Sequence, residues 1–337
     1  MKTVNINGKA IGKGHPTYVI AEIGINHNGE VKLAKDTIDA AIESGADAVK
    51  LQTYSTEGFV HTDSPIFDAV KSCELTKDEY IELFDYAKSK GAVVFSTPEC
   101  LEDIEFLKEL NPPAIKIASM DMNYRQFVQK IAESGSPVII STGMSYMHEV
   151  ANSVRWIEET GNSEIILLHC VSCYPTPSEE CNLSVIPKLA STFGYPTGFS
   201  DHTVTLDIPF ASACLGANLI EKHFTLDKTL KGPDHAGSAD PEEMKTLINW
   251  LCNLEKTIGN SIKEPSKSEK KTRLKKRRSI YAKRDLEKGY VLTIADVQFL
   301  TPSAPESQLE DLEGFLGRQL KDNVKKDEMV TRSLLIQ

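Results

Sequence analysis

Two histidines in this chain are well placed to hold a divalent metal. His202 lies in GFSDHT (198–203) and His223 in LIEKHF (219–224), each where a short apolar run typical of a β-strand ends. A single histidine in such a place is more often structural, but two neutral imidazoles on neighbouring strands could share one ion. Asp201 or Glu221 could orient an imidazole, and Glu221 could itself be a ligand. The residue types alone leave Mn²⁺, Mg²⁺, Fe²⁺ and Zn²⁺ open.

Three charged side chains interrupt apolar runs that otherwise predict buried strands: Glu22, Lys50 and Lys116. Ionised groups are costly to bury unless they meet opposite charges or a ligand. A structural Glu22–Lys50 ion pair is one explanation. The other is a pocket for a phosphate and a carboxylate, in which the two lysines supply charge and hydroxyls supply directed hydrogen bonds. The hydroxyls that follow predicted strands are those of Thr97, Ser119, Ser141 and Ser172.

Eight short apolar runs that could position these side chains alternate with longer segments of helical period. The runs span residues 18–24, 47–53, 92–97, 114–119, 137–142, 164–170, 196–201 and 218–224. Strands that are apolar on both faces and alternate with helices predict an all-parallel sheet with helical cover. Eight such repeats favour an α/β fold closed into a (β/α)₈ TIM barrel, with its chemistry at the C-terminal rim. The opening VNINGKAIGKG contains an Asn-Gly turn, which predicts an N-terminal hairpin that caps the barrel floor.

Composition limits the classes of function. The chain has 337 residues and a net charge of −10, so neither nucleic acid nor an anionic membrane surface is an expected partner. No signal peptide is visible, and no apolar run approaches the roughly 20 residues that span a bilayer. Seven scattered cysteines indicate reduced thiols and a cytoplasmic protein. The close pair Cys170 and Cys173 leaves a metal or dithiol site as an alternative.

The pattern of the sequence changes near residue 260. Residues 1–263 are predicted to form the TIM-barrel catalytic domain, and residues 264–278, EPSKSEKKTRLKKRR, a basic linker. Residues 279–337 show short strands and tight turns, which predict a small β-rich domain. A basic run of this kind can contact nucleic acid, but the acidic chain around it disfavours that reading.

Nine motifs together resemble the sialic acid synthase (N-acetylneuraminate synthase) family. They are AEIGINHNG (21–29), GADAVKLQT (45–53), FSTP (95–98), IKIAS (115–119), ISTGM (140–144), LLHC with YPTP (167–177), GFSDHT (198–203), EKHFTLD (221–227) and GPDHAGSADP (232–241). The tail from Ser279 onward resembles the family's C-terminal antifreeze-like, or SAF, domain. The likeness spans nearly the whole chain.

The resemblance implies a reaction: phosphoenolpyruvate condenses with an N-acylated mannosamine-type sugar to give a nonulosonic acid, and phosphate leaves by C–O cleavage. It also implies a domain-swapped homodimer. The metal, usually Mn²⁺, would be held by His202 and His223, with Glu221 acting nearby. The resemblance assigns phosphoenolpyruvate to Lys50, Thr97, Lys116, Ser119, Ser141 and Ser172, and the sugar to Glu22, Gln52, Tyr174, Ser200 and Asp234.

The sequence departs from the family pattern at two places. Ser172 stands two residues before Tyr174, where many sialic acid synthases have Asn. Thr301, in FLTPSAPES (299–307), stands approximately where the family has an arginine that reaches the partner's sugar site, and Arg318 could compensate. The acceptor could therefore be N-acetylmannosamine, a diacetamido-trideoxy hexose that leads to legionaminic or pseudaminic acid, or another related sugar.

Two other classes remain as alternatives. One is another phosphoenolpyruvate-dependent synthase, such as the 3-deoxy-octulosonate 8-phosphate type. The other is a non-catalytic carbohydrate-binding or ice-surface protein, which has no need of a metal site together with two buried lysines.

Overall fold

The computed structural model describes residues 2–301 and 312–336, and the chain divides into two compact units, Met1–Gly259 and Asn260–Gln337. Each unit has an apolar core of its own.

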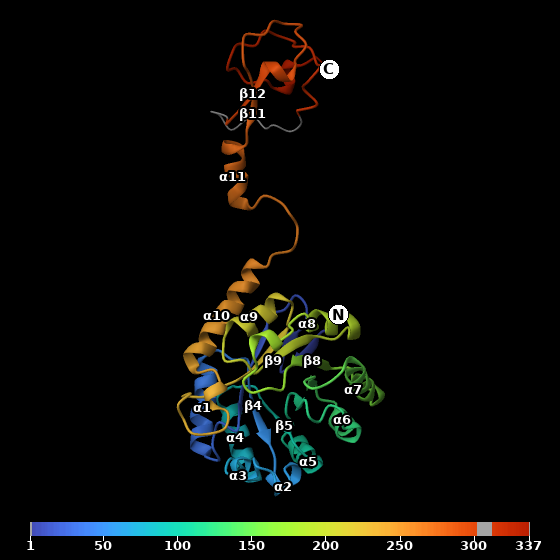
Figure 1. The fold of residues 1–337 in the computed structure, drawn as a ribbon, viewed down its shortest axis with the longest axis vertical. Helices are drawn as coiled ribbons and strands as arrows, with labels where there is room; N and C mark the ends of the chain where they lie inside the picture. The colour runs from blue at the N-terminus through green and yellow to red at the C-terminus, as the bar shows by residue number, and fades with distance from the viewer. Residues whose placement is uncertain (1, 302–311, 337) are drawn as a thin grey trace. The chain divides into compact units, whose positions relative to one another are not determined.

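The first unit is a closed barrel of eight parallel strands (Figure 1). Neighbouring strands pair in the order β10-β3-β4-β5-β6-β7-β8-β9, so each strand lies beside the next along the chain and the last closes on the first. This confirms the predicted (β/α)₈ barrel. The strands are β3 Tyr18–Gly24, β4 Ala48–Thr53, β5 Val94–Pro98, β6 Ile115–Ile117, β7 Val138–Ser141, β8 Ile165–Cys170, β9 Thr197–Asp201 and β10 Leu219–His223.

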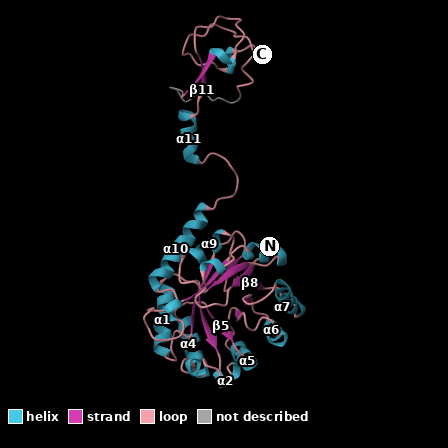
Figure 2. Ribbon diagram, viewed as in Figure 1, coloured by secondary structure: helices cyan, strands magenta, loops and turns pink. Residues whose placement is uncertain are grey.

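Helices surround these strands, as Figure 2 shows in cyan around magenta. One outward row of strand residues, including Val19 and Val49, packs against helical residues such as Ile38 and Leu83. The short α2 and α3 lie in the connection that follows β4. The helices are α1 Val31–Glu43, α2 Thr56–Phe59, α3 Phe67–Lys71, α4 Lys77–Ser89, α5 Leu101–Glu109, α6 Arg125–Ala132, α7 Met147–Glu159, α8 Val185–Phe193, α9 Asp207–Cys214 and α10 Pro241–Thr257.

Local sequence signals explain where several of these helices begin and end. Helix α4 begins with a capping box in which Thr76 and Glu79 satisfy each other's backbone N–H groups. Helix α10 begins in the same way with Asp240 and Glu243. Helix α1 ends at Glu43, and Gly45 follows its C-cap residue Ser44 with a φ of 91°, in the left-handed region that favours glycine.

An N-terminal hairpin closes the floor of the barrel. Strands β1 Val4–Ile6 and β2 Lys9–Ile11 pair antiparallel across Asn7 and Gly8, which both have positive φ. The fully buried side chains of Val4, Ile6 and Ile11 pack with the interior of the barrel, in one apolar cluster with residues such as Ile20, Phe95 and Leu168. The predicted hairpin cap is therefore confirmed, and the barrel interior is filled at this end.

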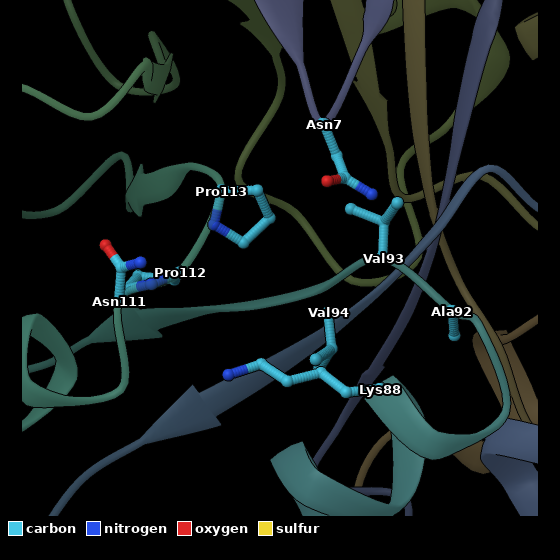
Figure 3. Close-up of a pocket in the computed structure, with 8 residues that line it drawn as sticks. All are labelled: Asn7, Lys88, Ala92, Val93, Val94, Asn111, Pro112 and Pro113. Atoms are coloured by element: carbon cyan, nitrogen blue, oxygen red, sulfur yellow. The ribbon is translucent and has the colours of Figure 1, made fainter.

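A pocket of about 440 Å³ lies beside this hairpin (Figure 3). Among the described residues that line it, Lys88 alone is charged, and its Nζ donates to the carbonyl of Leu110. None of the predicted site residues lines it. The lining consists of Asn7, Lys88, Ala92, Val93, Val94, Asn111, Pro112 and Pro113.

In its described residues, the second unit contains one α-helix, two short 3-10 helices and a small β-structure. The segment 264–278, predicted as a linker, forms helix α11 Lys267–Lys276, which begins with a capping box between Ser266 and Glu269. Strands β11 Ser279–Ala282 and β12 Val297–Leu300 then pair antiparallel. An isolated bridge joins Tyr281 of β11 to Met329, and further bridges join residues outside these two strands. Ten buried apolar residues, including Ile280, Leu292 and Leu320, form the core of this unit.

A membrane span requires a helix of sufficient length and apolar character. None of the described helices is both long enough and apolar enough to cross a bilayer.

Candidate active site

Strand alternation turns a row of polar side chains toward the barrel axis. Successive strand residues point to opposite faces, and in β3 the residues Val19, Ala21 and Ile23 pack outward against helices. Glu22 must therefore point inward. The same reasoning applies to Lys50, which lies between Val49 and Leu51 of that outward cluster, and to Lys116, between Ile115 and Ile117 of another.

The two lysines lie in one network with two carboxylates. Lys50 Nζ lies 2.5 Å from Glu22 Oε2 and donates to Thr97 Oγ1 over 3.0 Å. Glu221 lies between the lysines, 3.8 Å from Lys50 and 3.7 Å from Lys116. These groups come from β3, β4, β5, β6 and β10, so only barrel closure brings them together.

Hydroxyl and amide groups complete this network. Lys116 Nζ donates to Ser141 Oγ over 2.7 Å, and Ser200 Oγ donates to Glu221 Oε1 over 3.1 Å. Gln52 Nε2 donates to Glu22 Oε1 over 3.1 Å. The structural Glu22–Lys50 pair considered from the sequence is present, but it is one contact in a larger polar pocket.

Burial and neighbouring charges act against each other in this pocket. Burial would lower the pKa of Lys50, but Glu22 and Glu221 raise it above its ordinary value. Burial would likewise raise the pKa of Glu221, but Lys116 and Lys50 lower it. The structure therefore favours a charged ammonium at Lys50 and a carboxylate at Glu221.

Two serines meet at Gly143, just after β7. Ser119 Oγ accepts from the Gly143 N–H over 3.0 Å. A Cβ added at Gly143 would lie 2.3 Å from Ser172 Oγ and 2.8 Å from Ser119 Oγ, so a side chain there would fill the space beside both hydroxyls. Glycine keeps this space open between β6, β7 and β8.

The histidines lie together at the C-terminal rim. The ring centroids of His202 and His223 are 5.4 Å apart, and the ring of the exposed Tyr174 lies 4.0 Å from that of His202. His202 Nδ1 lies 2.8 Å from the Val171 carbonyl, and His223 Nδ1 lies 3.4 Å from Asp234 Oδ2. Because a carbonyl oxygen only accepts, the neutral form of His202 carries its proton on Nδ1 and has its lone pair on Nε2. Burial would lower the pKa of His202, but the neighbouring Cys170 raises it above the ordinary value.

Asp234 therefore takes the orienting position beside His223. Burial would raise its pKa, but the hydrogen bond and charge of His223 lower it below the ordinary value. The interpretation of Asp201 as such a carboxylate is wrong. Asp201 directly precedes His202, so its side chain points to the opposite face of the barrel wall. Its Oδ2 accepts from Lys222 Nζ over 2.7 Å, in a buried ion pair.

The residues of this rim fit a metal with open coordination positions. Both imidazoles have a partner for Nδ1, as metal-binding histidines commonly do. In the part of the chain that the structure describes, no group of three His, Cys, Asp or Glu side chains is placed to hold an ion. A metal here would be held by two protein nitrogens, and substrate or water would fill its other positions.

The two close cysteines do not form a paired site. Cys170 is buried, with Sγ 3.8 Å from His202 Nδ1, whereas Cys173 is exposed and its Sγ contacts the Pro175 carbonyl. All seven cysteines are free in the structure. The dithiol alternative has no support in this geometry.

Sequence reasoning missed two carboxyl groups near the lysines, Glu99 and Asp121. Each has a buried side-chain oxygen without a hydrogen-bond partner. The available signal was spacing, since Glu99 lies two residues after Thr97 and so continues its face of the strand.

The predicted site residues of the tail are only partly visible. Thr301 and Arg318 are exposed in the second unit, and residues 302–307 of the segment FLTPSAPES lie outside the described residues. That Thr301 stands in the place of the family's arginine therefore stays a prediction.

The fold and these side chains define a class of protein, a (β/α)₈-barrel enzyme whose polar site lies at the C-terminal ends of its strands. The chain belongs to the NeuB family, whose model matches residues 37–263, and the SAF domain model matches residues 277–336.

Similar proteins agree with this assignment. An uncharacterized protein of Methanocaldococcus jannaschii is 43% identical over 98% of this chain and 98% of its own length. An N,N'-diacetyllegionaminic acid synthase of Campylobacter jejuni is 36% identical, over 93% of this chain and 98% of its own. The structure of an N-acetylneuraminic acid synthetase from Leptospira borgpetersenii superposes with a TM-score of 0.77 at 35% identity, over 80% of this chain and 95% of that one.

Proposed function

We propose that this protein is a nonulosonic acid synthase that condenses phosphoenolpyruvate with an N-acylated mannosamine-type sugar and releases phosphate by C–O cleavage. One observation carries the proposal: two buried lysines with hydroxyl partners lie inside the same barrel rim that carries a histidine pair. Named relatives in the same family synthesise acids of this class.

Phosphoenolpyruvate fits the lysine pocket by charge and by hydrogen bonding. Lys50 and Lys116 would neutralise the phosphate of this ligand, which leaves in the reaction, and its carboxylate, which stays in the product. Thr97 and Ser141 contact these lysines, and Ser119 and Ser172 lie beside Gly143. These four hydroxyls can therefore donate to the same ligand.

The sugar would lie above this pocket, near the histidines. Gln52, Tyr174, Ser200 and Asp234 offer amide, hydroxyl and carboxylate groups to its hydroxyls. His202 and His223 would hold a divalent ion, most simply Mn²⁺, through their Nε2 atoms. When bound, such an ion supplies Lewis-acid polarisation of the sugar aldehyde.

The carboxyl groups of Glu22 and Glu221 would stabilise positive charge and transfer protons as the new C–C bond forms. When C3 of phosphoenolpyruvate bonds to the aldehyde carbon, positive charge develops at C2, and Glu22 or Glu221 can stabilise it. Water then adds at C2, and loss of phosphate leaves the ketone. Burial raises the pKa of Glu22 despite the opposing effect of Lys50, so Glu22 is suited to exchange a proton with the added water.

The tail and the cell compartment complete the proposal. The protein would act as a domain-swapped homodimer in which the SAF domain of one protomer reaches the sugar site of its partner. The reaction would take place in the cytoplasm, in keeping with the seven free thiols.

The test is phosphate release from phosphoenolpyruvate with Mn²⁺ and a panel of acceptors: N-acetylmannosamine, mannose, a diacetamido-trideoxy hexose and arabinose 5-phosphate. We expect release with one N-acylated hexose, and a nine-carbon keto acid by mass spectrometry. Release only with arabinose 5-phosphate would replace this proposal by the octulosonate-type alternative. Silence across the panel with folded, metal-loaded protein would contradict it.

A further inference from the structure

Glu99 points into the lysine pocket, although it lies one residue beyond strand β5. The ladder between β4 and β5 continues to this position, because the Glu99 N–H donates to the Thr53 carbonyl over 3.2 Å. Phe95 packs in the barrel interior and Thr97 contacts Lys50. Since strand side chains alternate, Glu99 is the next residue on this inward face.

The carboxyl group of Glu99 is buried and incompletely bonded. The residue is 9% exposed, and its Oε2 has no hydrogen-bond partner among the described residues. Asp121 follows β6 two residues after Ser119, and its buried Oδ2 also lacks a described partner. An unpaired polar atom of this kind in a buried position calls for a ligand, a proton or a water molecule.

The charges around Glu99 oppose its ionisation. Burial raises its pKa well above the ordinary value, Asp121 and Glu22 raise it further, and Lys50 and Lys116 act in the opposite direction. Burial also raises the pKa of Asp121, to about 6. Two carboxylates at one site repel each other, so one of the two commonly keeps its proton while the other is ionised.

Binding of phosphoenolpyruvate would increase this effect. Four carboxyl groups already interact with the two lysines. Glu22, Glu99 and Glu221 raise the pKa of Lys50, and Lys116 lowers the pKa of Asp121. A trianionic ligand brings more negative charge into that space. An ionised Glu99 would repel it, whereas a neutral one can donate a hydrogen bond to it.

We propose that Glu99 stays protonated in the pocket and donates a hydrogen bond to an anionic oxygen of bound phosphoenolpyruvate, with Asp121 as the neighbouring carboxylate that keeps it protonated. This inference rests on the proposed function. It makes the affinity for phosphoenolpyruvate dependent on pH. Affinity is highest below the pKa of Glu99 and falls as the pH rises through it, because the proton must be present for the ligand to bind.

The test is isothermal titration of phosphoenolpyruvate into the full-length protein with Mn²⁺, between about pH 7 and 9.5, where the ligand phosphate is mostly dianionic. We expect the wild-type Kd to rise with pH by up to about tenfold per pH unit beyond the pKa of Glu99. Glu99→Gln keeps an N–H donor and is neutral at every pH, so its Kd should lose this rise. Glu109→Gln, an exposed change at the end of α5, should behave as wild type.

Asp121→Asn provides a second variant. Removing its negative charge should lower the pKa of Glu99, so the rise in Kd should begin at a lower pH than in the wild type. This shift supports the inference even if Glu99→Gln does not fold.

The outcomes separate the two proposals. If the wild type binds phosphoenolpyruvate and Glu99→Gln keeps the wild-type pH dependence, the inference is overturned and the proposed function stands. An unshifted pH dependence in Asp121→Asn would remove the role of that residue. If the folded wild type binds no phosphoenolpyruvate at any pH, both proposals fall.

Discussion

Glu221 links the two halves of the lysine pocket at the scale of single residues. Its Oε2 lies 3.8 Å from Lys50 and its Oε1 3.7 Å from Lys116, and Ser200 donates to it. All three charged groups are at least 95% buried. Removing any one of them leaves a buried charge without its full opposite charge, which destabilises the fold, so variants must be checked for folding as well as for activity.

Lys116→Ala should raise the KM for phosphoenolpyruvate by about 10- to 1,000-fold, because an ammonium group that would face the anionic ligand is lost. Burial lowers the pKa of Lys116 and Glu221 opposes this effect, so the negative charge of the ligand would favour the charged form of the lysine. The measurement is phosphate release against phosphoenolpyruvate concentration, with circular dichroism to verify the fold. Lys130→Ala, which removes a lysine of α6 that contacts Glu105, is the matched control. An unchanged KM in folded Lys116→Ala would show that the phosphate pocket lies elsewhere.

Asp234→Asn should weaken Mn²⁺ binding by about 10- to 100-fold, because the carboxylate beside His223 Nδ1 orients the ring and strengthens its lone pair. His223→Ala and His202→Ala should remove metal-dependent turnover altogether. Metal affinity is measured by calorimetric titration. Asp63→Asn is the control, since it alters an exposed histidine–aspartate pair with His61; equal Mn²⁺ affinity in Asp234→Asn and this control would exclude an orienting role.

The inward-facing site residues could be predicted from the sequence where a polar residue interrupts or ends the apolar run of a single strand. Lys50, Lys116 and the histidines interrupt or end apolar runs, and their positions follow from alternation. Asp201 was misread because its partner, Lys222, lies on another strand and the pair faces away from the histidines. Glu99 was missed because one carboxylate beyond a strand resembles an ordinary loop residue until burial is known.

At the scale of elements, the contact between β9 and β10 depends on Gly198. A Cβ there would lie 2.2 Å from the Leu219 carbonyl oxygen and 2.7 Å from Leu168 Cδ2. Both atoms belong to neighbouring strands, so the backbone itself would have to move. The closest approach of these two strands is therefore set by the absence of a side chain.

Gly198→Ala should lower the free energy of unfolding by at least about 1–3 kcal/mol, because the added methyl group overpacks the barrel wall. Urea denaturation followed by circular dichroism measures it. Gly237→Ala is the matched control, since no heavy atom lies within 4 Å of its added Cβ and its φ is not positive. Equal denaturation midpoints for the two variants would contradict this account of the strand contact.

Element boundaries were less predictable than element order. All eight strands occur where the apolar runs predicted them, but β6 covers only Ile115–Ile117 of the predicted residues 114–119. Helix α11 was not predicted, because a polar segment without an apolar face gives no helical period. Its helix depends on lysine and arginine propensity and on the Ser266–Glu269 capping box.

At the scale of the whole molecule, charge differs between the two units. The tail from Asn260 carries the basic segment of α11, whereas the chain as a whole has a net charge of −10. The barrel is therefore the strongly acidic unit.

Ending the chain at Ser268 should leave a folded barrel and remove most of the activity, because the proposed partner contact at the sugar site is lost. The barrel has its own cores and hairpin floor, so its far-ultraviolet circular dichroism should remain that of an α/β protein. Turnover at saturating phosphoenolpyruvate is the measurement. Full activity of the shortened chain would show that the tail takes no part in the reaction.

The closed floor of the barrel has a consequence for the order in which reactants associate. Val4, Ile6 and Ile11 fill the N-terminal end, so a ligand of Lys50 and Lys116 must enter from the rim and pass the histidines. Those lysines lie within their strands, whereas His202 and His223 lie at strand ends. Under the proposed function, the sugar would cover the phosphoenolpyruvate once both are bound. Steady-state kinetics should then be sequential and ordered, with phosphoenolpyruvate adding before the sugar.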